Sequence, residues 1–161
     1  MMTSKNKPSR TILCPTDFST SSEQALCHAA RHCGGDTEMI VLHIGTPGSG
    51  DRGTLLKKHL HHFSEHSDLL SNYGCNVRFA VEYGTPSATI IDYADRVKAD
   101  MIVMGSHGES SIGRLLVGST AEAVMRHAPC PVLVLRSPKE QVETESCQKE
   151  KEETVTSNTN A

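Results

Sequence analysis

Short, largely apolar runs that alternate with helical stretches restrict the folds open to this chain more than any other feature. Each run has the length of a strand and ends at Gly, Pro or polar residues; the runs are Thr11–Cys14, Met39–Ile44, Val77–Val81, Met101–Met104 and Val132–Leu135. Between them, apolar residues recur at the spacing of a helix face. Strands joined through helices pair in parallel with right-handed crossovers. The pattern therefore predicts a single doubly wound α/β domain, with five parallel strands in the order 3-2-1-4-5 and helices on both faces of the sheet.

Four helices are expected between these strands. They are predicted to run from Glu23 to the Gly34–Gly35 pair, from Leu55 to about Tyr73, from Pro86 to Val97, and from about Gly113 to His127. In a doubly wound sheet, ligands bind outside the carboxyl ends of the strands where the winding direction reverses. For the predicted strand order this crevice lies between the first and fourth strands, so the loops that follow those two strands are expected to form the binding site.

Length and charge fit one domain with polar extensions. The chain has 161 residues and a formal net charge of -3, which is close to the size of one ordinary domain. We expect a flexible N-terminus at 1–9, a folded domain at 10–136 and a disordered, polar and acidic tail at 137–161. No apolar run reaches the length of a membrane span, and no signal-peptide core follows the N-terminus. The expected location is cytoplasmic, with no membrane partner.

The charged residues, cysteines and histidines constrain the partners and metals. The net charge of -3 gives no support for a surface that binds nucleic acid, since neutralising phosphates needs clustered Lys and Arg. The six cysteines contain no C-x-x-C pair, so neither a zinc ribbon nor a redox dithiol is indicated, and reduced thiols are expected. His59, His62 and His66 share one helical face, which we interpret as a solvated polar face rather than a metal site. Gly45–Gly50 has the glycine spacing of a P-loop, but the two residues that follow are not the required Lys and Ser or Thr.

A glycine motif follows the fourth strand. Gly105-Ser106-His107-Gly108 is separated by nine residues from Gly118-Ser119-Thr120. Glycines allow the backbone to approach a ligand closely or to adopt positive φ, and the N–H groups at a loop-to-helix transition can hold phosphate. Gly118 interrupts an otherwise helical pattern, which predicts a break or a close approach there. The motif therefore indicates two segments that contact an anion.

This motif resembles the signature of the ATP-binding branch of the universal stress protein family, G-x2-G-x9-G-[ST], and matches it completely. Leu13–Ser19, Leu42–Ile44 and Leu115–Val134 extend the resemblance, which covers about residues 10–136. It implies an ATP-binding stress-response or signalling module, with adenine against Asp17 and Ile44 and the phosphates on the glycines. The nucleotide-binding residues implied in this way are Pro15, Thr16, Asp17, Ile44, Met104, Gly105, Ser106, His107, Gly108, Gly118, Ser119 and Thr120.

The resemblance also implies a homodimer, in which the strand Val132–Leu135 pairs with its copy and no longer exposes an edge. ATP carries several negative charges, whereas the loop Gly105–Gly113 contains Glu109 and no Lys or Arg. We therefore expect Mg²⁺ or Mn²⁺ to be held through the phosphates, without dedicated protein ligands.

Some roles stay open at this point. No Ser/His/Asp set, paired carboxylates or H-x-G-H motif is found, so no catalytic residue is predicted and any ATP hydrolysis should be slow. The alternatives are a slow ATPase or nucleotidyl-transferring enzyme on the same scaffold, and a nucleotide-free interaction protein. Asp17 can equally be a helix-capping or loop residue, and His107 a spectator. Arg114 either reaches the phosphates or lies on an exposed helix face, and Thr120 either contacts phosphate or caps the helix.

Overall fold

The computed structural model describes residues 8–46, 48, 52–107 and 117–136. Its elements, in chain order, are β1 (Arg10–Thr16), α1 (Thr20–Arg31), β2 (Thr37–Gly45), α2 (Arg52–Leu70), the 3-10 helix η1 (Ser71–Tyr73), β3 (Asn76–Tyr83), α3 (Pro86–Val97), β4 (Met101–Gly105), α4 (Ser119–His127) and β5 (Val132–Leu135). The predicted alternation of strands and helices is therefore present throughout these ranges.

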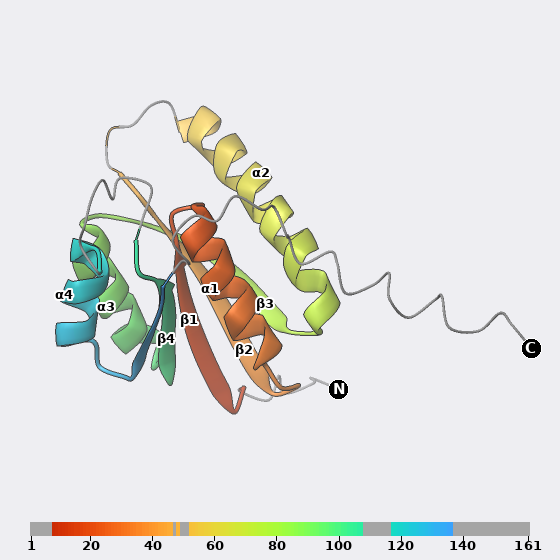
Figure 1. The fold of residues 1–161 in the computed structure, drawn as a ribbon. Helices are drawn as coiled ribbons and strands as arrows, with labels where there is room; N and C mark the ends of the chain where they lie inside the picture. Colours follow the sequence, from red (N-terminus) through yellow and green to blue (C-terminus); the bar gives the residue numbers. More distant parts are fainter. Residues whose placement is uncertain (1–7, 47, 49–51, 108–116, 137–161) are drawn as a thin grey trace, which may run out of the picture.

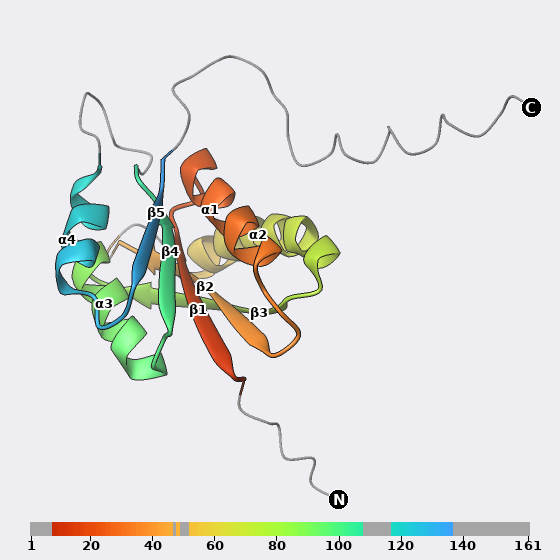
Figure 2. The same cartoon turned by 60° about the horizontal axis from the view of Figure 1, so that its bottom comes forward.

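The strands form one parallel sheet in the order β3-β2-β1-β4-β5, which confirms the predicted fold class and strand order. Figures 1 and 2 show α1 and α2 on one face of this sheet and α3 and α4 on the other. From β1 the chain passes outward through β2 to β3, and it then returns to β4 on the other side of β1. The winding direction therefore reverses between β1 and β4.

The central strands β1, β2 and β4 are covered on both faces, which explains why their apolar runs show little alternation. On one face, Ile12 and Cys14 of β1 pack in a cluster with residues of α1 and α2, whereas Leu13 packs with residues of α3 and α4 on the other. Each of the three is at most 2% exposed. Alternate residues of a strand point to opposite faces, so a strand that is covered on both faces needs apolar residues at every position.

Several helix boundaries differ from the prediction. α1 begins at Thr20 rather than Glu23, and α2 begins at Arg52 rather than Leu55. α1 ends before the Gly34–Gly35 pair, and neither of these glycines has a positive φ. α4 begins at Ser119 rather than near residue 113; residues 113–116 lie outside the described ranges, and Gly118 is extended, with φ -71° and ψ 160°. The break predicted at Gly118 is thus the start of the helix. Periodicity alone placed it too early because the apolar residues before Gly118 continue the helical spacing.

The expected extensions lie at the ends of the chain. The segment 1–9 is described only from residue 8, and the segment 137–161 lies outside the described residues, so the flexible N-terminus and the disordered tail stay predictions. Across the described ranges, none of the helices combines the length and the apolar character that crossing a membrane requires.

Candidate functional site

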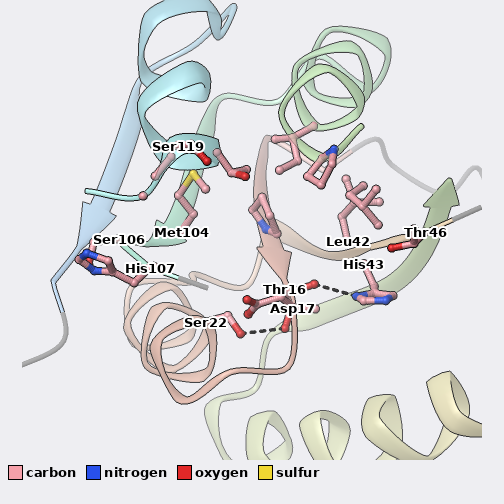
Figure 3. Close-up of a pocket in the computed structure, with 18 residues that line it drawn as sticks. Thr16, Asp17, Ser22, Leu42, His43, Thr46, Met104, Ser106, His107 and Ser119 are labelled. Atoms are coloured by element: carbon pink, nitrogen blue, oxygen red, sulfur yellow. Dashed lines mark hydrogen bonds between the residues drawn. The ribbon is translucent and has the colours of Figure 1, made fainter. Parts of the chain in front are cut away.

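A cavity of about 400 Å³ lies at the carboxyl ends of the central strands, where the winding reverses. Clefts of about 300–1,000 Å³ are typical of small-molecule sites. Figure 3 shows the side chains around it. The residues that line the cavity are Pro15, Thr16, Asp17, Ser22, Leu42, His43, Ile44, Thr46, Pro86, Ile90, Met104, Gly105, Ser106, His107, Gly118, Ser119, Thr120 and Ala121.

Eleven of the twelve residues implied for the site line this cavity. The twelfth, Gly108, lies outside the described residues, as does Arg114. The cavity is also lined by residues that the sequence did not identify as part of the site, namely Ser22, Leu42, His43, Thr46, Pro86, Ile90 and Ala121. The rule that ligands bind beyond strand ends could have found Thr46, which follows β2. The contribution of α3 depends on how its crossover packs on the sheet, so no local signal identifies it.

The loop after β1 is held by hydrogen bonds among its own residues. Thr16 Oγ1 accepts a hydrogen bond from Phe18 N at 3.1 Å and lies 3.1 Å from Ser22 Oγ, a contact that is dashed in Figure 3. Asp17 Oδ1 accepts one from Ser19 N at 3.1 Å, and Ser19 Oγ caps α1 by accepting one from Ser22 N at 3.3 Å. Asp17 therefore has the predicted loop role through one carboxylate oxygen and also lines the cavity.

Phe18, directly after Asp17, has a φ of 65°, a conformation that residues other than glycine rarely adopt. Its ring centroid lies 4.4 Å from that of His43, 4.4 Å from that of His62 and 5.7 Å from that of Phe63. A backbone strained in this way persists only where the surrounding contacts hold it. The packing of α2 and β2 on Phe18 therefore helps to position the loop that carries Asp17.

The interpretation of the three α2 histidines as a solvated polar face is wrong. His59 and His66 are only 6% and 2% exposed, because this face of α2 packs against Phe18. Burial lowers the pKa of both imidazoles below 6.5, so they are neutral at pH 7. Among the described residues, no three His, Cys, Asp or Glu side chains are grouped so that they could hold a metal ion. Helical spacing identifies the residues that share a face, but not whether another element covers it.

His43 connects the cavity to this aromatic cluster. Its Nδ1–H donates to the Thr16 carbonyl oxygen at 2.9 Å, and its ring centroid lies 4.7 Å from that of His59. Burial is the main cause that lowers the pKa of His43. Charge on His59 or His62 acts in the same direction, while the Thr16 carbonyl and Asp17 oppose it. His43 therefore presents a neutral ring to the cavity.

Gly105, at the end of β4, is a glycine because α1 passes very close to it. A Cβ at this position would lie 2.9 Å from the carbonyl carbon and oxygen of Ser21, and it would also collide with Ser21 Oγ. The φ of Gly105 is not positive. The sequence predicted that a glycine is present here to let a ligand approach or to allow a positive φ. The structure shows instead that a larger residue would collide with the backbone of α1.

The N-terminus of α4 contributes backbone donors to the cavity. Gly118 is the N-cap and has no side chain to accept a hydrogen bond, and its own N–H donates to the Ser106 carbonyl at 2.7 Å. The first residues of α4, Ser119, Thr120 and Ala121, line the cavity. Because the first N–H groups of a helix lack intrahelical partners and carry partial positive charge, this wall is suited to an anion.

Ser106 links this wall to the sheet. It is 1% exposed, and its N–H donates to the Leu135 carbonyl at 2.8 Å, while its own carbonyl accepts from Gly118. Its hydroxyl lies 2.8 Å from Nδ1 of His107. Ser106 therefore joins β4, β5 and the start of α4, and it orients the imidazole that lines the cavity. No Lys or Arg is among the described residues of the lining.

Comparison with known proteins is consistent with this architecture. A model of the universal stress protein family matches residues 8–136. The chain belongs to the universal stress protein family. A relative in this family, a universal stress protein of Methanocaldococcus jannaschii, is 32% identical over 142 residues, which cover 81% of this chain and 84% of the relative.

Two solved structures of universal stress proteins share the fold. UspA from Lactobacillus plantarum is 28% identical with a TM-score of 0.67, over 79% of this chain and 97% of that one. A universal stress protein in complex with cAMP is 25% identical with a TM-score of 0.68, over 80% of this chain and 98% of that one. The family suggested by the glycine motif is thereby confirmed.

Proposed function

We propose that this universal stress protein binds ATP in the cavity between β1 and β4 and acts as a nucleotide-dependent stress-response or signalling module. The observation that carries the proposal is the uncapped N-terminus of α4, which begins at the second half of the glycine signature and lines the cavity. Phosphates would accept hydrogen bonds from its first N–H groups. Adenine would lie against Asp17 and Ile44 at the ends of β1 and β2.

The neighbour solved with cAMP supports an adenine nucleotide as the class of ligand. ATP, AMP and cAMP share the base and differ in their phosphates, so calorimetric titration of all three separates recognition of the base from recognition of the phosphates. We expect ATP to bind most tightly. If AMP or cAMP binds more tightly, that nucleotide rather than ATP is the ligand. If none of the three binds, a nucleotide-free interaction protein is favoured.

Gly118→Val tests where the phosphates bind. The φ and ψ of Gly118 are extended and open to valine, so the variant should fold, while its side chain enters the space at the start of α4. We expect ATP affinity to fall by tenfold or more. The matched control is Gly34→Val, since nothing lies within 4 Å of a Cβ at that position. Wild-type affinity in a folded Gly118→Val protein would refute the site.

The alternative of a slow ATPase or nucleotidyl-transferring enzyme predicts product formation. Phosphate release at saturating ATP, compared with the amount of nucleotide retained by the protein, distinguishes turnover from binding. Retention of one ATP per chain without phosphate release supports the binding module.

The proposal also includes a cytoplasmic location, an unidentified protein partner and a homodimer. β5 lies at the edge of the sheet, and its Leu133 is 37% exposed. An apolar edge strand is an aggregation hazard that pairing with a second copy removes. Sedimentation analysis over a range of concentrations tests the dimer, and a monomer at every concentration would exclude it.

A further inference from the structure

Cys33 and Cys75 meet at one backbone carbonyl, although they are far apart in the sequence. Cys33 follows α1, and its N–H donates to the Ala30 oxygen at 3.2 Å. Cys75 precedes β3, and its thiol donates to the same oxygen at 3.3 Å. The Cys75 side chain is close enough to that of Cys33 to raise its pKa. Both are half-buried, and neither forms a disulfide in this structure.

This pair is remote from the candidate nucleotide site. α1 starts beside the cavity and has 12 residues, so its other end, where Cys33 follows, lies about 18 Å away. Both cysteines pack against the cluster that fills the α1 and α2 face of the sheet. The inference about the pair is therefore independent of whether the cavity binds ATP.

We propose that Cys33 and Cys75 are a redox-sensitive pair that a hydroperoxide converts into an intramolecular disulfide. In the first step, the thiolate of one cysteine attacks a peroxide oxygen, the O–O bond breaks, and a sulfenic acid forms as hydroxide leaves. In the second step, the other thiol loses its proton and attacks the sulfenic sulfur, so that the S–S bond forms and water leaves. Two thiols and one hydrogen peroxide thus give one disulfide and two waters.

Neighbouring groups act on the thiol of Cys33. Burial and the Cys75 side chain raise its pKa to about 12, although the nearby Arg10 acts in the opposite direction. Attack on the peroxide requires a thiolate, and either sulfur can take this role, with the other then resolving the sulfenic acid. Cys33 and Cys75 are both close enough to influence Cys14, but Cys14 is fully buried, and burial raises its pKa far above the ordinary value. It therefore takes no part in the first step.

The test uses the full reduced chain, treated with hydrogen peroxide, alkylated and digested without reductant for mass spectrometry. We expect a product lighter by about two mass units, with the peptides of Cys33 and Cys75 joined. Cys33→Ser and Cys75→Ser should each abolish this cross-link. Cys130→Ser is the matched control, because Cys130 is half-buried on the opposite face of the sheet, and it should leave the cross-link unchanged.

Dimedone, which traps sulfenic acids, shows which sulfur attacks the peroxide first. At least one of the two variants, Cys33→Ser and Cys75→Ser, should give a dimedone adduct on the cysteine of the pair that remains. Circular dichroism of both variants establishes that they are folded. A cross-link that involves Cys14 or Cys147, a disulfide only between chains, or no disulfide in the folded wild-type protein would overturn the proposal. Absence of a dimedone adduct on Cys33 and Cys75 in both folded variants would also overturn it.

Discussion

Replacing Gly105 by alanine should destabilise the fold, because the new methyl group meets the backbone of α1. It would lie 2.9 Å from the carbonyl carbon and oxygen of Ser21. A side-chain oxygen can rotate away, but this carbonyl belongs to the first turn of α1 and moves only if the helix shifts. Overpacking of this kind costs about 1–3 kcal/mol, and each kcal/mol lowers the Tm of a chain of this size by about 2–4 °C. We expect a loss of about 2 kcal/mol in the free energy of unfolding and about 6 °C in Tm.

Urea unfolding followed by circular dichroism measures this loss. Gly34→Ala is the matched control: a Cβ there meets nothing within 4 Å, and φ is not positive, so its stability should stay the same or rise slightly. Because Ser22, beside Ser21, contacts Thr16 in the cavity wall, the folded Gly105→Ala protein should also bind ATP more weakly. If Gly105→Ala unfolds within about 0.5 kcal/mol of the wild type, α1 does not approach β4 as closely as described.

Three further outcomes are expected. Burial lowers the pKa of His43, His59 and His66 below 6.5, so the unfolded chain binds more protons than the folded one as the pH falls through that value. The free energy of unfolding should therefore fall below about pH 6.5 and be retained above it, and His66→Gln should weaken this dependence in urea titrations. ATP affinity measured by calorimetry should fall in excess EDTA, with a smaller loss for AMP; equal ATP affinity with and without Mg²⁺ would exclude the metal. A chain that ends at Pro138 should keep ATP binding and its oligomeric state, and loss of a wild-type dimer on truncation would contradict the expected role of the tail.

The binding crevice could be predicted because it depends on signals that are local in the sequence. Pro15, Asp17 and Met104 lie at the ends of recognisable apolar strands, and the reversal of winding brings the ends of β1 and β4 together. Gly118 was identified as a break because glycine is unfavourable inside a helix. The exact start of α4 and the cavity contribution of α3 were not accessible in this way, since apolar spacing is insensitive to N-caps and to crossover packing.

The sequence by itself determined the five-stranded parallel sheet, its strand order, the family and the edge of the sheet that carries the candidate site. These properties could be predicted because they follow from the periodicity of apolar residues and the spacing of glycines, which are visible in the sequence itself. Only the tertiary structure decided that His59 and His66 are buried, that Gly105 must be small because of Ser21, and that Cys33 lies beside Cys75. Each of these depends on which elements pack against one another across long stretches of chain. A residue's type sets what its side chain can do, but the neighbours that control its burial, space and charge are supplied by the fold.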